Sequence, residues 1–364
     1  MPELKYIERV NTVLKPRAHL NPRIVIDLFA GCGGLALGFE ALGFKTIGFE
    51  VDKDCCETYK KNLGRECVQS FLNDKSDFPA ADVVIGGPPC QPFSLRGKQR
   101  GHADERNGFP AFISAVKKVQ PKLWIFENVK GLLFKNKEYL NQVIESLKGL
   151  GYSVDLHLVN AVDYGVPQNR ERIIVIGYQT GEFIFPEKSN VKMTAGDALG
   201  KMALAAPRGS RYLTASMDAY IAKYEKASMC RVPRDLHLHL PARTLTCRNL
   251  SGATSDMQRI RLPNGKRRRL LSREAARLQS FPDWFEFCGN ESSIFNQIGN
   301  AVPPLLSYQL AGAVMRYMEM HGDKTVAKSN ESDRKWKYAY QQKMILHALT
   351  AELGINRSKV YEEV

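Results

Sequence analysis

The feature that most constrains the fold is an alternation of apolar runs with amphipathic stretches between residues 24 and 178. Apolar runs typical of strands cover residues 24–29, 44–50, 83–87, 123–129, 152–159 and 172–178. Helical patterns lie between some of them, at residues 35–42 and 138–150. Strands that are buried on both faces and joined by helices form mainly parallel sheets. We therefore predict an α/β fold with a mixed, mainly parallel sheet that helices cover on both faces.

The sequence changes character after Tyr178. Residues 183–285 are rich in proline, glycine and arginine, which predicts an irregular and smaller second domain. A helical pattern at residues 305–320 would return to the first domain, and a polar linker and a further helical pattern at 336–353 follow. We thus expect four parts: residues 1–182, residues 183–285, a return at 286–320, and a C-terminal extension at 321–364.

Charge and cysteine usage narrow the class of protein. The 52 lysines and arginines exceed the 38 acidic residues, for a net charge of +14, which favours a polyanion such as nucleic acid as partner. A basic protein without such a partner is an equal alternative on charge alone. The eight cysteines are scattered without metal-ligand spacing, so we expect neither a metal site nor a disulfide scaffold. The chain shows no signal peptide and no membrane span, so we expect a cytoplasmic protein with reduced thiols.

A glycine-rich turn follows the first strand. Gly31, Gly33 and Gly34 would let a ligand approach the backbone, and Glu50 at the end of the next strand could accept hydrogen bonds from ribose hydroxyls. An adenosyl ligand, a dinucleotide and a turn without ligand are all compatible with this pattern. The spacing is G-x-G-G, with Ala36 where a dinucleotide motif has its third glycine, and no later segment suggests hydride transfer.

Cys90 is a candidate nucleophile. It stands in the segment GGPPCQPFSLRGKQRGH, after a short buried strand and between prolines that restrict its backbone. Most cysteines are small buried apolar residues. Here Arg96, Lys98 and Arg100 follow closely, and cations favour the reactive thiolate and can also bind phosphate.

Three more charged residues are expected near Cys90. Glu127 ends another strand, so it should reach the same edge of the sheet, where a carboxyl group can act as acid or base. Arg170 and Arg172 stand at alternate positions, which would place their side chains on one face. Two surface arginines are the alternative reading.

In combination these motifs identify a family. The order DLFAGCGGL, GGPPCQPFS, ENV, QNRER, REAARLQSFP and QIGNAVPP resembles the cytosine-C5 DNA methyltransferases of bacterial restriction-modification type, over residues 24–320. The resemblance implies a Rossmann-like, S-adenosylmethionine-dependent methyltransferase fold. It also makes residues 183–285 a target-recognition domain and the rest of residues 1–320 the catalytic and cofactor-binding domain.

The resemblance assigns the catalytic roles. Cys90 would add to C6 of a cytosine that is flipped out of duplex DNA, and this addition activates C5 for methyl transfer. Glu127 would bind the ring and assist protonation at N3, while Arg172 would hold the ring carbonyl. Arg170 matches the other arginine of that motif. No metal is required.

The cofactor and DNA contacts are assigned in the same way. Residues implied to contact S-adenosylmethionine are Phe29, Gly31, Gly33, Gly34, Leu35, Glu50, Val51, Phe71, Pro89, Asn300 and Val302. One position departs from the family, because Ser70 and Phe71 stand where an acidic and an apolar residue would contact adenine, and Asp74 fits only with an insertion. Residues implied to contact DNA are Gln91, Ser94, Arg96 and Lys98 in a mobile loop, and Thr244 and Arg248 in the second domain. Lys266 to Arg269 could meet phosphates or form a solvated face.

We therefore expect a DNA (cytosine-5-)-methyltransferase that uses S-adenosylmethionine, acts as a monomer near the nucleoid, and can have a cognate restriction endonuclease. A transfer RNA cytosine-5 methyltransferase and a catalytically inactive DNA-binding protein are the alternatives. A dinucleotide-dependent oxidoreductase comes last.

Overall fold

The computed structural model describes residues 6–18, 22–89, 107–227, 229, 234–252 and 256–321. Its centre is a seven-stranded sheet with the order β3-β2-β1-β4-β5-β7-β6. The strands are β1 (Ile24–Leu28), β2 (Lys45–Glu50), β3 (Cys67–Gln69), β4 (Val83–Gly86), β5 (Leu123–Val129), β6 (Ser153–Asn160) and β7 (Glu171–Tyr178). The first five strands pair in parallel, while β7 runs antiparallel to both β5 and β6. The predicted mixed, mainly parallel sheet is confirmed.

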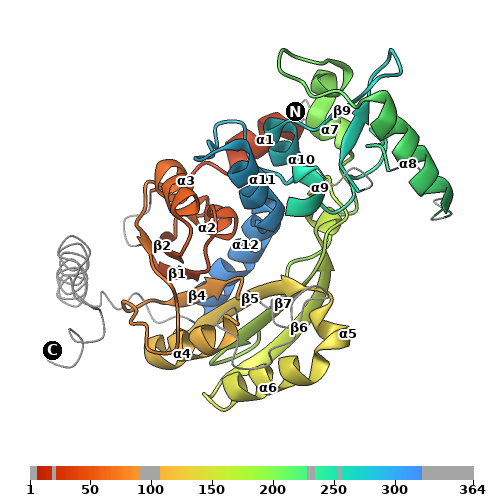
Figure 1. Cartoon of the computed structure of the whole chain (residues 1–364). Helices are drawn as coiled ribbons and strands as arrows, with labels where there is room; N and C mark the ends of the chain where they lie inside the picture. The colour runs from red at the N-terminus through yellow and green to blue at the C-terminus, as the bar shows by residue number, and fades with distance from the viewer. Residues whose placement is uncertain are drawn as a thin grey trace, which may run out of the picture.

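Helices cover both faces of this sheet (Figure 1). One face packs against α1 (Tyr6–Val13), α2 (Gly34–Glu40), α3 (Lys53–Leu63) and α12 (Pro304–His321). The other face packs against α4 (Phe109–Val119), α5 (Leu132–Lys135) and α6 (Lys137–Lys148). Successive side chains of a strand point to opposite faces, so Ile125 joins the first hydrophobic cluster and its neighbours Trp124 and Phe126 join the second. This alternation explains why the run from Leu123 to Phe126 in β5 is apolar at every position.

The return of the chain to the first domain depends on one glycine. A Cβ atom at Gly38 in α2 would lie 2.3 Å from the backbone nitrogen of Tyr308 in α12, so the two helices can cross this closely only without a side chain there. Ser307 adds a hydrogen bond to the carbonyl oxygen of Leu35. The predicted helix at residues 305–320 is thereby confirmed, and it packs against α2.

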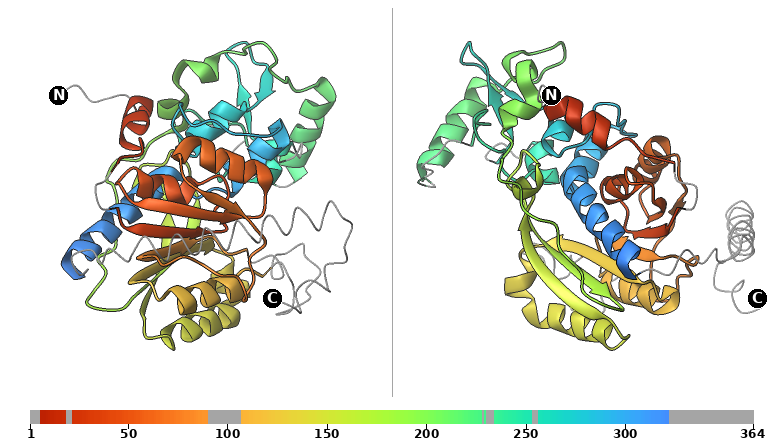
Figure 2. Two further views of the ribbon diagram at one scale, coloured as in Figure 1. Left: turned by 90° about the vertical axis from the view of Figure 1, so that its left-hand side faces the viewer. Right: turned by 180° about the vertical axis from the view of Figure 1, so that it is seen from behind.

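Short elements make up the second region, which gathers at one end of the molecule, beyond the sheet (Figure 2). They are α7 (Ala195–Leu199), η4 (Gly200–Leu204), α8 (Ala215–Ala227), α9 (Cys247–Ser251), β8 (Arg259–Arg261) and β9 (Arg267–Arg269). Then α10 (Ser272–Leu278) and α11 (Glu291–Asn300) lead back towards α12, and η3 (Ala161–Tyr164) joins β6 to β7. A buried ion pair between Arg268 and Glu274, 2.7 Å long, ties the β8–β9 ribbon to α10.

The predicted strands and the predicted helices within the described ranges are present, with ends that differ by one or two residues. The helical pattern at residues 336–353 lies outside the described residues. No described helix is long and apolar enough to cross a bilayer. The described residues also contain no group of His, Cys, Asp and Glu side chains that could hold a metal ion.

Candidate active site

The glycine turn is held in a strained, compact form at the carboxyl end of β1. Phe29, Gly31 and Gly33 all have positive φ angles, of 57°, 53° and 89°. A Cβ atom at Gly34 would lie 2.5 Å from the carbonyl oxygen of Val302, just before α12. Glycine at position 34 therefore lets the turn pack directly against the returning segment, and this packing brings Val302 beside the turn, as the motif order implied.

Glu50 fixes the turn from the neighbouring strand. One carboxylate oxygen accepts a hydrogen bond of 2.9 Å from the amide of Gly31, and the other accepts from the amides of Val51 and Asp52, at 2.8 and 2.9 Å. A Cβ atom at Gly31 would meet no atom within 4 Å, so there is open space beside this carboxylate. A fixed acceptor next to open backbone suits the ribose of a nucleoside ligand.

Two apolar side chains stand exposed at the same edge. Val51 is 59% and Phe71 57% exposed, although both are the kind of side chain that is usually buried. The register pairs Glu50 with Gln69, and the amide of Ser70 donates to the carbonyl of Glu50 at 2.9 Å, so the side chains of Val51 and Phe71 follow neighbouring strand ends. Asp74 instead lies beside α4, where its carbonyl accepts from Ser114. Phe71 is thus better placed than Asp74 to contact an adenine.

Glu127 and Arg172 are brought together by β5 and β7. Glu127 Oε1 lies 2.8 Å from Arg172 Nε, and the side chains are only 11% and 12% exposed. The antiparallel register pairs Val129 with Arg172, which places the arginine diagonally across from the glutamate. The result is a preorganised pair with a carboxylate and a guanidinium on one edge of the sheet.

The chain that leads to Cys90 runs beside this pair. Asn128 Nδ2 donates to the carbonyl of Pro88 at 2.9 Å, and the amide of Gly108 donates to the carbonyl of Pro89 at 3.0 Å. A Cβ atom at Gly87 would have Glu127 Oε2 as a neighbour at 3.8 Å. The backbone is therefore anchored next to Glu127 up to Pro89. Cys90, Gln91, Ser94, Arg96, Lys98 and Arg100 lie outside the described residues.

Pro89 also connects this segment with the glycine turn. A Cβ atom at Gly108 would lie 2.4 Å from Pro89 Cδ and 2.9 Å from the Phe29 ring. Because position 108 is a glycine, Pro89 and the Phe29 ring can both pack against its backbone. The sequence implied a pocket role for both residues, but it contained no pattern that identified Gly108.

Arg170 does not share the position of Arg172. Its buried guanidinium donates to the carbonyls of Leu245, Gly299 and Ala301, at 2.9, 3.2 and 3.0 Å. Burial lowers the pKa of Arg170 to about 9, with the charge of Arg172 contributing and Glu127 opposing, so the group stays protonated at neutral pH. Arg172 pairs with Glu127, whereas Arg170 binds backbone carbonyls, so the two arginines of the motif have different partners. Arg170 joins the second region to the α11–α12 connection.

Gln168, which opens the QNRER motif, reinforces this junction. Its amide nitrogen donates to the carbonyl of Leu278 and to Gln279, and its oxygen accepts from the amide of Leu245 at 2.9 Å. Gln168 was not among the expected site residues. The signal available was its place in the motif, two residues before Arg170.

The remaining expected contacts are distributed over the same junction. Leu35 is buried beneath the turn, and exposed Asn300 accepts from the Cys247 thiol at 2.9 Å. Thr244 donates to the carbonyl of Asn169 at 2.6 Å, and Arg248 is exposed on α9. In the basic run of residues 266–269, Arg267 forms ion pairs with Asp218 and Asp235, and Arg268 forms a buried ion pair with Glu274. These two arginines are engaged within the protein.

Comparisons with known proteins agree with this geometry. A family model described as C-5 cytosine-specific DNA methylase matches residues 24–316. The type II methyltransferase M.AplI of Arthrospira platensis is 53% identical over 320 residues, which are 87% of this chain and 92% of that protein. M1.HphI of Haemophilus parahaemolyticus is 38% identical over 80% of this chain and 86% of its own length. A crystal structure of a putative DNA modification methyltransferase encoded within an Escherichia coli prophage aligns with a TM-score of 0.60 and 26% identity, covering 82% of this chain and 99% of that one. The chain therefore belongs to the C-5 cytosine-specific DNA methylases and is a DNA cytosine-5 methyltransferase of type II restriction-modification kind.

Proposed function

We propose that this enzyme methylates C5 of a cytosine flipped out of duplex DNA, with S-adenosylmethionine as donor and a transient bond between Cys90 Sγ and ring carbon C6. One observation carries the proposal: the Glu127–Arg172 pair lies beside the segment that leads to Cys90, and Pro89 joins that segment to the glycine turn. The segment up to Pro89, the ring-binding groups and the cofactor turn thus lie at one edge of the sheet, and Cys90 is the next residue in the chain.

The residues at the turn fit S-adenosylmethionine. Glu50 offers fixed oxygen atoms to ribose hydroxyls, and Val51 and Phe71 offer apolar surfaces to adenine. Phe29, Gly31, Gly33, Gly34, Leu35, Pro89, Asn300 and Val302 would complete the pocket. When bound, S-adenosylmethionine supplies an electrophilic methyl group.

The protein groups would act on the cytosine ring in sequence. Attack of the Cys90 thiolate on C6 forms the S–C6 bond and moves electron density to C5, while Glu127 protonates N3 and Arg172 donates to the ring carbonyl. Once C5 carries the methyl group, loss of the C5 proton to a base, return of the N3 proton to Glu127 and cleavage of the S–C6 bond restore the aromatic ring and the thiolate. Arg170 supports this site as a positioning residue, because its guanidinium contacts only backbone carbonyls within the described ranges.

DNA would lie between the sheet edge and the second region. We infer that residues 183–285 form the target-recognition domain, that residues 1–182 and 286–320 form the catalytic domain, and that residues 321–364 extend it. The proposed DNA contacts are Thr244, Arg248, Gln91, Ser94, Arg96 and Lys98. We also propose that the enzyme is a cytoplasmic monomer and has a cognate restriction endonuclease. The description of the matching family model as a DNA methylase favours DNA over transfer RNA as substrate.

A covalent trap tests the mechanism. Duplex DNA with 5-fluorocytosine should form a stable adduct in the presence of cofactor, because fluorine at C5 cannot be removed as a proton is. Cys90→Ser should abolish the adduct, whereas Cys288→Ser should retain it. An adduct that persists in Cys90→Ser would disprove the assignment of the nucleophile. Mapping of methylated cytosines in exposed DNA would give the recognition sequence, and methylation of RNA alone would favour the alternative substrate.

A further inference from the structure

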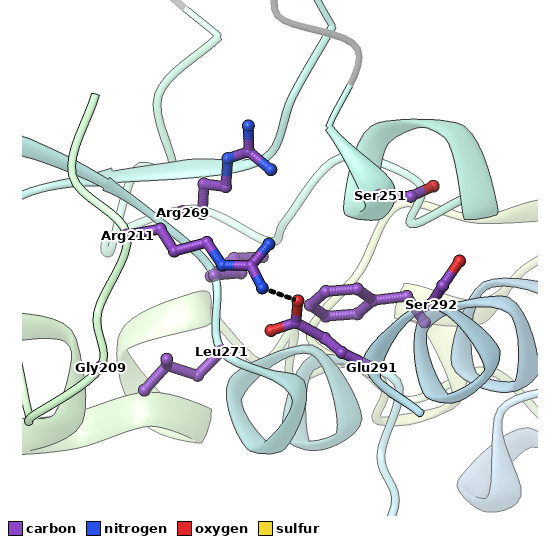
Figure 3. A pocket seen from close by; sticks show the side chains of 9 residues that line it. Gly209, Arg211, Ser251, Arg269, Leu271, Glu291 and Ser292 are labelled. Carbon is purple, nitrogen blue, oxygen red and sulfur yellow. Dashed lines mark ion pairs between the residues drawn. The ribbon is translucent and has the colours of Figure 1, made fainter. Parts of the chain in front are cut away.

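A cavity of about 140 Å³ lies where the second region meets the beginning of α11 (Figure 3). Arg211 and Arg269 come from the second region, Ser251 from the end of α9, and Glu291 and Ser292 from the first turn of α11. The cavity has room for several waters or for one phosphate group. Its polar side chains carry two positive charges and one negative charge.

The negative charge is held by a weak interaction. Arg211 Nη2 lies 2.6 Å from Glu291 Oε2, but the two side chains are 61% and 48% exposed. Exposed ion pairs contribute little to stability, so an incoming anion can replace Glu291 at little cost. Figure 3 shows Arg211 turned towards Glu291, with Ser251 and Ser292 on the opposite side.

Arg269 carries the second positive charge, and its position differs from that of the arginines before it. Arg267 and Arg268 are engaged by carboxylates, whereas no carboxylate in the described ranges forms an ion pair with Arg269. Its guanidinium lies against Gly252, where a Cβ atom would be 2.7 Å from Nη1. Two constraints favour glycine at position 252: its φ angle of 113° is rare for other residues, and a Cβ atom there would collide with the Arg269 guanidinium.

The cavity adjoins the surface that the proposed function assigns to DNA. Ser251 and Gly252 end α9, the helix that carries exposed Arg248. The amides of Glu291 and Ser292 add partial positive charge because they have no partner within the helix, whereas the amide of Ser293 donates to Asn290 Oδ1 at 3.0 Å. The Ser251 hydroxyl already donates to the carbonyl of Cys247, which leaves two arginines, the Ser292 hydroxyl and a helix N-terminus around one cavity, and these groups are the chemistry of a phosphate site.

We propose that this cavity binds a backbone phosphate of the DNA substrate, with Arg211 leaving Glu291 to join Arg269 on the phosphate. The proposal rests on duplex DNA being the substrate. A phosphate contact does not depend on the bases, so the cavity would strengthen binding to any duplex sequence and would set the position of the second region on the DNA. Glu291 would act as a placeholder that weakens the contact until a phosphate arrives.

Binding of a labelled duplex of unrelated sequence, followed by fluorescence anisotropy over a range of salt concentrations, tests the proposal. Arg211→Ala and Arg269→Ala should each weaken binding roughly 3- to 10-fold near 0.1 M salt and reduce the slope of log affinity against log salt by about 1. Lys148→Ala is the matched control, because it removes one charge from an exposed ion pair with Glu145 on α6. This control should leave the slope unchanged.

Glu291→Gln gives the opposite prediction. The substitution frees Arg211 without removing a positive charge, so duplex binding should become tighter by a factor of roughly 2 to 5. Tighter binding cannot result from a damaged fold, so this variant keeps the test decisive even if the arginine variants are unstable. Weaker binding by Glu291→Gln, or arginine variants that match Lys148→Ala, would overturn the proposal.

Two further measurements separate the possible failures. If the wild-type protein methylates DNA and the cavity variants bind DNA normally, the proposed enzyme function stands and the proposed phosphate site is excluded. Wild-type protein that neither binds nor methylates duplex DNA would overturn the proposed function itself. Inorganic phosphate should compete weakly with DNA for the cavity. If free phosphate stabilises the protein but does not change its affinity for DNA, the cavity binds a free anion instead.

Discussion

Glu127 and Arg172 form an ion pair of 2.8 Å across two antiparallel strands, at the point where the chain enters the Cys90 segment. If Glu127 protonates the cytosine ring, Glu127→Gln should lower the rate of methyl transfer about 10²- to 10⁴-fold, because the amide keeps the shape but is not an acid. Transfer of a radiolabelled methyl group to plasmid DNA measures this.

Glu171→Gln is the control for that experiment. Glu171 precedes Arg172 in the sequence and forms an exposed ion pair with Lys130. Its substitution should therefore change the rate of methyl transfer little. An equal loss of rate in both variants would contradict a specific role for Glu127.

Arg170 should matter for stability more than any exposed arginine. Arg170→Met leaves the carbonyls of Leu245, Gly299 and Ala301 without their charged donor, and we expect the free energy of unfolding to fall by about 3 kcal/mol or more. Urea unfolding measures this. Arg248→Met, on the surface of α9, should lie within about 0.5 kcal/mol of wild type. A stable Arg170→Met variant that has lost only activity would point to direct catalysis by Arg170.

Gly34 tests the packing of the turn against the returning chain. Gly34→Ala would force a Cβ atom to within 2.5 Å of the Val302 carbonyl oxygen, so we expect weaker cofactor binding, by 10-fold or more, and lower stability. Gly131→Ala is the control, because its Cβ atom would meet nothing within 4 Å and its φ angle of −56° suits any residue. Isothermal titration with S-adenosylhomocysteine compares them, and equal affinities would refute the packing argument.

The sheet could be predicted from the sequence because its strands carry a clear physical pattern. Both faces are buried, so Trp124, Ile125 and Phe126 form an uninterrupted apolar run with a length typical of a strand. The second region has no such pattern. Its order depends on ion pairs between residues far apart in the sequence, such as Arg267 with Asp218 and Arg259 with Asp235, and charged residues in a sequence normally indicate surface.

The active site also has a part that the sequence predicts and a part that it does not. Glu50, the glycine turn and Glu127 lie at one edge because β1, β2 and β5 are parallel and end together, and Arg172 meets Glu127 there from the start of antiparallel β7. The role of Arg170 could not be deduced in this way. Its acceptors are backbone carbonyls contributed by segments far away in the chain, and a carbonyl leaves no trace in residue identity.

Asp27 should make stability depend on pH. One of its oxygens is buried without a hydrogen-bond partner, and burial raises its pKa well above 3.8, with Glu50 contributing and the Ala36 amide opposing. Because the folded pKa lies above the unfolded one, the stabilising contribution is complete below about pH 4 and is lost as the pH rises through the folded pKa.

Asp27→Asn removes this titration. The free energy of unfolding of wild type should therefore fall relative to Asp27→Asn as the pH rises above about 4, by up to ~1.4 kcal/mol per pH unit until the folded pKa is passed. Urea unfolding at several pH values measures the difference. Asp77→Asn, whose side chain is 80% exposed, should run parallel to wild type. A constant difference between Asp27→Asn and wild type would show that Asp27 is ionised in the folded protein throughout.

Substitutions at Phe71 and Asp74 can decide which of the two residues contacts the adenine of S-adenosylmethionine. Phe71 is 57% exposed at the end of β3, whereas Asp74 lies in a turn whose backbone is held by Ser114 of α4. Removal of a stacking ring should weaken binding of the ground state and the transition state alike, so Phe71→Ala should raise the KM for S-adenosylmethionine about 10-fold with little change in kcat. Asp74→Ala should leave both constants unchanged, and Phe71→Tyr should restore the wild-type KM because it retains the ring. A raised KM in Asp74→Ala with a normal Phe71→Ala would mean that the segment after β3 rearranges to bring Asp74 to the adenine.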